Sequence, residues 1–113
     1  MSKTGYMIFR PDGTSERGEV DWPHEPGYDR LKRMIEPIVG GPLEHVAVLH
    51  NGKRADMFVD EMGHVYATGP KPFNEAATKI YRANWMKQHP GQDPEDLPTI
   101  AGIAVLFDRI VWM

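Results

Sequence analysis

The chain has 113 residues, a formal net charge of −3 and no cysteine. This length fits a single domain, 1–113, with one modest core. The lack of cysteine excludes disulfides, thiolate nucleophiles and cysteine-based metal sites. The negative charge disfavours a nonspecific nucleic-acid binder. The longest apolar run, residues 100–107, is too short to cross a bilayer, and no apolar signal segment precedes it. We therefore expect a cytoplasmic protein with no membrane partner.

The first residues predict a β-hairpin. Strand-forming residues at 6–9 precede Pro-Asp-Gly at 11–13, where proline fixes φ and glycine accepts a positive φ. The second arm, residues 14–20, is polar, so we expect a solvated edge strand. Gly18 is the place in that arm where a bulge would form.

A helix is predicted next, because apolar residues recur at spacings of three and four. These residues are Tyr28, Leu31, Ile35 and Ile38. Pro37 is expected to end or kink the helix near Ile35, since its ring displaces a hydrogen bond to the preceding turn. The glycines at 40–41 then release the chain.

The strongest strand pattern surrounds Asn51-Gly52, the dipeptide of a two-residue type I′ turn. This turn pairs Val48 with Ala55 on a largely apolar face. The opposite set, which contains Asp56, is mixed, and we expect it to be half exposed. A further reversal at 60–63 leads to a short third strand at 64–67.

A second helix begins near Asn74, whose side chain is a good N-cap, and stops near Gln88. Glu75 and Lys79 have the spacing of an ion pair on this helix. Residues 89–98 are predicted to form a surface loop. The final strand is expected from Ile103 to Val111, with its first half buried on both faces.

The element order is therefore β-β-α-β-β-β-α-β, an α+β domain. We expect a mixed or antiparallel sheet of about six strands, with both helices on one face. An open sheet edge also permits a homodimer.

Several of these pieces together resemble the DUF3846 family of small phage and mobile-element proteins. The similarity covers nearly the whole chain, and its most specific part is a D-E-x-G reversal followed by N-x-x-A-T-x-apolar-Y. Those positions are Asp60, Glu61, Gly63, Asn74, Ala77, Thr78, Ile80 and Tyr81. The resemblance implies an accessory protein borne by a phage or prophage. It implies no reaction, because the family is one of unknown function, and residues 89–98 are an elaboration beyond its usual form.

No catalytic, metal or cofactor motif is present. His50 and His64 with Asp60 are the one set that turns bring near each other, but solvated turn histidines explain them better. Asp56, Asp60 and Glu61 could suggest an acid pair, but Asp60 and Glu61 are adjacent on a turn, which explains them better. We therefore expect no cofactor. A small enzyme using His50, Asp60, His64 or Tyr81 ranks last among the functions.

Three groups of residues are candidates for binding. On the second helix they are Asn74, Thr78, Tyr81 and Arg82, of which Thr78 and Arg82 lie off the apolar stripe. Among the tryptophans, Trp22 in a proline loop and Trp112 near the C-terminus are candidate exposed anchors.

The third group is a basic patch, which a solvated helix face explains better than contact with nucleic acid does. Its members are Arg30, Arg33, Lys53 and Arg54. We rank a protein-binding module with a host or phage partner first. A nucleic-acid-associated regulator, supported by this patch, ranks second.

Overall fold

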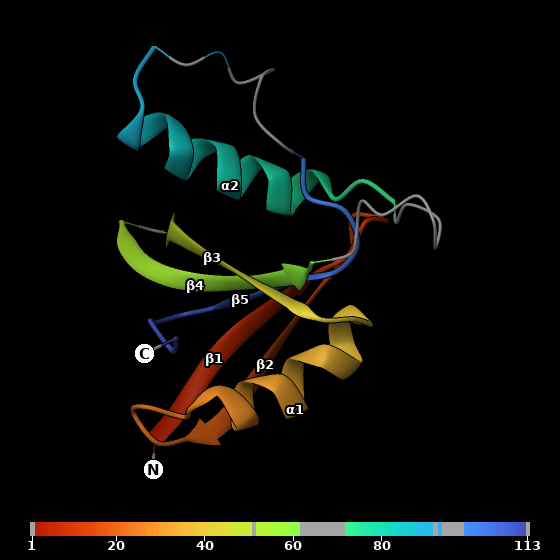
Figure 1. Cartoon of the computed structure of the whole chain (residues 1–113), viewed down its shortest axis with the longest axis vertical. Helices are drawn as coiled ribbons and strands as arrows, with labels where there is room; N and C mark the ends of the chain where they lie inside the picture. The colour runs from red at the N-terminus through yellow and green to blue at the C-terminus, as the bar shows by residue number, and fades with distance from the viewer. Residues whose placement is uncertain (1, 51, 62–71, 92, 94–98, 113) are drawn as a thin grey trace.

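The computed structural model describes residues 2–50, 52–61, 72–91, 93 and 99–112. This part of the chain forms one antiparallel sheet with a helix on each side (Figure 1). The elements are β1 (Ser2–Phe9), β2 (Ser15–Trp22), α1 (Tyr28–Val39), β3 (Leu43–His50), β4 (Lys53–Asp60), α2 (Glu75–Gln88) and β5 (Ala104–Phe107). The described sheet has five strands in the order β2-β1-β5-β4-β3. The predicted α+β class is confirmed, and the strand predicted at 64–67 lies outside the described residues.

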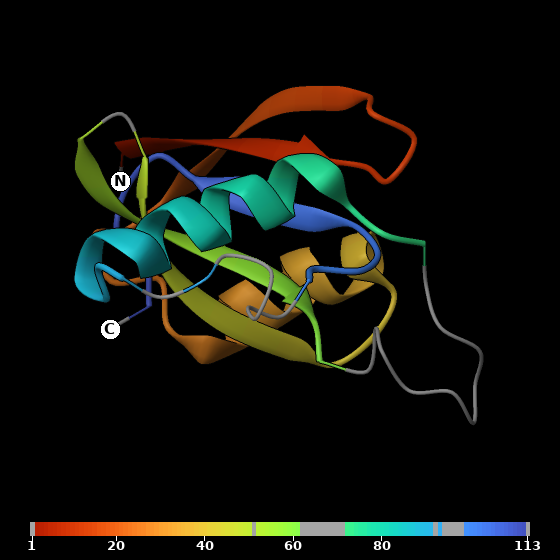
Figure 2. The same cartoon turned by 90° about the horizontal axis from the view of Figure 1, so that it is seen from above.

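The two helices lie on opposite faces of the sheet, so the expectation that both cover one face is wrong. Side chains alternate along β5: Val105 packs in the core beneath α1, whereas Leu106 packs in the core beneath α2. The prediction that the start of this strand is buried on both faces is confirmed. A helical stripe shows that a helix is buried on one side, but it does not show which face of a sheet it covers. Figure 2 shows α2 crossing its face, with the β1–β2 hairpin projecting to one side.

Pro37 lies inside α1 and does not end it, so of the two expected effects, an end or a kink near Ile35, the end is wrong. The next turn is held in place by Val39, which is 2 % exposed and belongs to the core. Gly40 closes the helix with φ of 82°, and its N–H donates to the Glu36 carbonyl at 2.7 Å. Burial of Val39 therefore outweighs the hydrogen bond that proline removes.

Each residue of β1 pairs with one residue of β2 without interruption, so no bulge forms at Gly18. Gly18 faces Tyr6, and a Cβ at this glycine would lie 2.4 Å from the tyrosine ring. The ring therefore occupies the space that a side chain would need. As predicted, β2 is an edge strand of the described sheet, and most of its residues are exposed.

The predicted register of the β3–β4 hairpin is confirmed, including the pairing of Val48 with Ala55. The expectation that the opposite set is half exposed is wrong for Asp56 and Phe58, which are 3 % and 0 % exposed. The reason is that β4 lies between β3 and β5, and α1 covers this face.

The last strand is shorter than predicted, because the chain leaves the sheet after Phe107. The Arg109 guanidinium then bonds the Thr4 hydroxyl at 3.1 Å and the carbonyls of Pro23 and His24 at 3.0 and 2.8 Å. These bonds tie the C-terminal segment to β1 and to the loop before α1. None of the helices in the described part of the chain is long and apolar enough to span a membrane.

Candidate functional site

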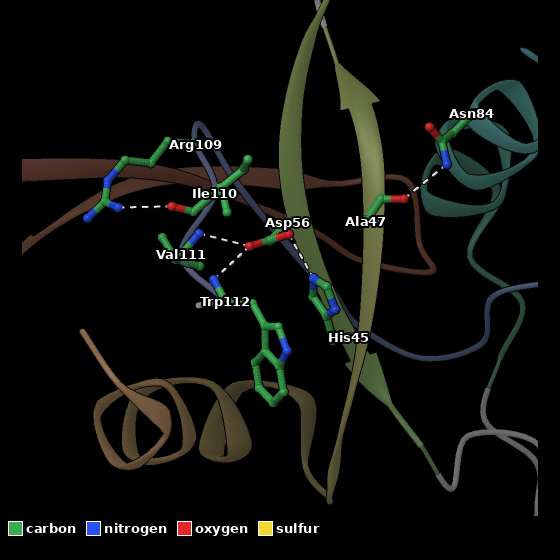
Figure 3. Close-up of polar contacts among 8 residues, drawn as sticks. All are labelled: His45, Ala47, Asp56, Asn84, Arg109, Ile110, Val111 and Trp112. Atoms are coloured by element: carbon green, nitrogen blue, oxygen red, sulfur yellow. Dashed lines mark hydrogen bonds and ion pairs between the residues drawn. The ribbon is translucent and has the colours of Figure 1, made fainter. Parts of the chain in front are cut away.

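The candidate site is built on Asp56, a buried carboxylate in the middle of β4. Its Oδ2 accepts the backbone N–H groups of Val111 at 2.8 Å and of Trp112 at 2.7 Å. Its Oδ1 lies 2.7 Å from Nε2 of His45 on β3 (Figure 3). A buried carboxylate is tolerated when donors surround it, and three donors do so here. Asp56 thus fastens the C-terminal segment to the sheet.

His45 links this carboxylate to the ring of Trp112. A carboxylate only accepts hydrogen bonds, so the imidazole Nε2–H is the donor. The imidazole also stacks on the indole of Trp112, with centroids 5.2 Å apart and planes 11° from parallel. The position of Trp112 is therefore set twice, by its backbone N–H and by its ring.

Trp112 nevertheless remains open to solvent. It is 42 % exposed, and its ring meets that of Tyr28 edge to face at 5.9 Å and 82°. Tyr28, in the first turn of α1, is 53 % exposed. We call Tyr28, His45 and Trp112 the aromatic corner. Segments that are distant in the sequence supply this corner: α1, β3 and the C-terminal segment.

The Asp56–His45 pair is suited to fixing the position of Trp112 at the surface. A carboxylate–imidazole pair is part of many general-base systems, but there the imidazole also contacts a nucleophile. In the described residues no hydrogen bond joins His45 to a hydroxyl group. Within the same part of the chain, no three histidine, aspartate or glutamate side chains lie close enough to hold a metal ion. His64, named in the predicted histidine set, lies outside the described residues.

The predicted candidates at the start of α2 have structural roles. Asn74 is fully buried and caps the helix as predicted, since its Oδ1 accepts the Ala77 N–H at 3.1 Å. Its Nδ2 also donates to the carbonyls of Phe9 and Gly102 at 2.9 and 2.8 Å. One side chain therefore joins α2, β1 and the loop before β5.

Thr78 is buried at 2 %, which corrects its placement off the buried stripe. Its hydroxyl accepts the Ile100 N–H at 2.9 Å. Tyr81 and Arg82 are both half-buried on α2, on the other side of the sheet from α1. Neither belongs to the aromatic corner. The expected ion pair between Glu75 and Lys79 is present at 3.2 Å.

Trp22 is not available as an exposed anchor. It is 6 % exposed and stacks on Phe107 in the core beneath α1, with centroids 5.4 Å apart. The role of Trp112 as an anchor stays a prediction, with its exposure now known.

The four cations of the predicted basic patch divide between separate places. Arg30 and Arg33 line a hollow beside Trp22. Arg54 lines a different hollow with Asn84 of α2, and Lys53 is exposed at the start of β4. The expected single patch is therefore replaced by a cationic flank on α1 and a smaller one at the β3–β4 turn.

Sequence reasoning missed the pairing of His45 with Asp56, although the signal was present. The predicted register places His45 opposite Phe58 and Asp56 opposite Ala47. Side chains of such neighbouring pairs on one face lie diagonally within reach of each other. An aspartate in the middle of a strand is itself unusual, because strands are depleted in aspartate.

Comparison with known proteins leaves the site to be judged on its own geometry. No protein-family model, no curated protein and no solved structure matches the chain. The resemblance to the DUF3846 family therefore stays a prediction.

Proposed function

We propose that this chain is a non-catalytic protein-binding module that docks a partner protein on the aromatic corner. The observation that carries the proposal is the 42 % exposure of Trp112, an indole held by a buried carboxylate. The Trp112 ring contacts the core residue Phe58, with centroids 6.0 Å apart, and still leaves much of its surface open to solvent. A polar network that fixes such a ring supports a role at the surface.

The energetics of protein interfaces favour this surface. Tryptophan and tyrosine are enriched among the residues that supply most of the binding energy. Association costs free energy when mobile side chains become ordered, so a ring already fixed in place binds at a lower cost. Trp112 has both properties: it is a tryptophan, and His45 and Asp56 fix its position before a partner binds.

The partner that we propose is a protein of the phage or of its host. This part of the proposal comes from the family resemblance, which implies an accessory protein of phage or prophage origin. A small exposed aromatic surface also suits an accessory protein, because it docks on another protein without chemistry of its own.

Comparative capture tests the proposal. Immobilised wild-type protein, Trp112→Ala and Phe73→Ala are incubated with the same lysate of the source cells, and bound proteins are quantified by mass spectrometry. Phe73 is the matched control, since it is also an exposed aromatic residue, 51 % exposed, outside the corner. We expect at least one protein to be lost about tenfold or more with Trp112→Ala and retained with Phe73→Ala.

Equal recovery by all three baits would refute the proposal. Light scattering on the free proteins distinguishes a second copy of this chain from a different partner. A wild-type dimer that Trp112→Ala converts to a monomer would make the partner a second copy.

A further inference from the structure

Arg30 and Arg33 form a pair of cations on the exposed side of α1. Both are exposed on α1, and neither makes an ion pair or a hydrogen bond in the described structure. Other arginines are engaged: Arg10 pairs with Glu16 at 2.6 Å, and Arg17 pairs with Asp108 at 2.8 Å. Residues three apart on a helix are neighbours, with Cβ atoms about 5–6 Å apart. Both side chains therefore leave the same flank of α1, and both line one hollow beside Trp22.

A hollow of about 410 Å³ separates these arginines from the end of β2. It is lined by Asp21, Trp22, Arg30, Arg33 and Met34, and we call it the α1 groove. The groove exists because α1 packs on β3, β4 and β5, at the other end of the sheet from β2. Its lining joins apolar atoms to two free cations, which is a different chemistry from that of the aromatic corner.

We infer that the α1 groove binds an acidic segment of a partner protein. Carboxylates of that segment meet Arg30 and Arg33, because a guanidinium group matches a carboxylate in a two-bond geometry. An apolar side chain of the segment covers Met34, which is half-buried, and the edge of Trp22. Since β2 is an edge strand of the described sheet, an extended segment can also pair with its backbone.

Charge favours a peptide over a nucleic acid as the occupant. The chain carries a net charge of −3, and Asp21 lies in the lining of the groove. A continuous polyanion would be repelled by the Asp21 carboxylate and by the net negative charge, whereas a peptide can place its few carboxylates at the arginines alone.

The test uses a blocked, fluorescent peptide of alternating glutamate and leucine pairs, with a glutamine version as its control. Anisotropy at low salt measures binding to the wild-type protein, to Arg30→Glu/Arg33→Glu and to Lys53→Glu/Arg54→Glu. The last variant is the matched control, because it makes the same change in net charge at two other exposed cations. Heteronuclear NMR follows the Trp22 indole N–H in the same titration.

We expect the glutamate peptide to bind and to shift the Trp22 signal. We expect Arg30→Glu/Arg33→Glu to weaken binding at least about tenfold, and Lys53→Glu/Arg54→Glu to weaken it less than about threefold. Equal losses in the two variants, or no binding of the peptide, would overturn the inference. A single-stranded oligonucleotide that binds the groove more tightly than the peptide would overturn it too. The inference uses none of the residues of the aromatic corner, so a variant Trp112→Ala with unchanged peptide binding separates it from the proposed function.

Discussion

Removal of the Asp56 carboxylate should lower the free energy of unfolding more than substitution of an exposed aspartate does. In Asp56→Ala, the N–H groups of His45, Val111 and Trp112 all lose their acceptor. A buried donor left unsatisfied costs about 1–3 kcal/mol, and three donors lose their acceptor at once. We therefore expect Asp56→Ala to lower the free energy of unfolding by about 3–5 kcal/mol.

Asp56→Asn gives a graded second point. The amide oxygen still accepts the two backbone N–H groups, and the amide N–H₂ can donate to Nε2 of the imidazole once the ring proton moves to Nδ1. What is lost is the charge, since hydrogen bonds to a charged group contribute about twice as much as neutral ones. We expect a loss of about 1–2 kcal/mol. Asp108→Asn is the control, because its pair with Arg17 is exposed and contributes less than about 1 kcal/mol.

Urea unfolding followed by tryptophan fluorescence and circular dichroism measures these changes. The transition midpoint should fall in the order Asp108→Asn, Asp56→Asn, Asp56→Ala, with an unchanged dependence on urea. An Asp56→Ala protein as stable as Asp108→Asn would refute the role of Asp56 as the anchor of the C-terminal segment.

Three further predictions test other parts of the fold. Asn74→Asp keeps the helix cap but sets a carboxylate against the carbonyls of Phe9 and Gly102, so it should cost at least as much stability as Asn74→Ala. Chemical denaturation checks this, and an Asp variant as stable as wild type would show that Asn74 is only a cap. Gly18→Ala should lower stability by about 1–3 kcal/mol, because its Cβ would meet the Tyr6 ring; the double variant with Tyr6→Ala should recover part of this loss, and equal damage in both backgrounds would contradict the reasoning. Hydrogen bonds from the hydroxyl and then the backbone N–H of Thr14 lower the pKa of Asp12 below its ordinary value. The turn is thus stabilised at pH above the unfolded pKa of about 3.9 and loses this contribution as pH falls through the lowered folded pKa. A carboxyl NMR titration of Thr14→Val should show the Asp12 midpoint raised relative to wild type, and an identical midpoint would contradict the assignment.

Local signals in the sequence were sufficient for the elements that depend on local chemistry. The Asn51-Gly52 dipeptide predicted the β3–β4 register, and Asn74 predicted the start of α2. Both depend on backbone geometry within a few residues. The prediction that α1 could end near Ile35 was wrong, because a tertiary contact of Val39 outweighs the local effect of Pro37.

The arrangement of the elements required information that local patterns do not carry. Either face of a sheet accepts an amphipathic helix, so the stripes of α1 and α2 did not reveal that they lie on opposite faces. The end of β5 depends on Arg109, whose partners lie about 85 to 105 positions earlier in the chain. The candidate site has the same origin, because Asp56 binds backbone groups 55 and 56 positions away. Only its contact with His45 was accessible from the hairpin register.

The measurement that tests the central proposal most directly is site-specific photocrosslinking. The photoreactive residue p-benzoylphenylalanine replaces Trp112 in one protein and Phe73 in another, and each is irradiated in a lysate of the source cells. The account predicts a discrete protein adduct from position 112 that is absent from position 73. Adducts of the same proteins in equal yield from both positions, or none from position 112, would contradict the account.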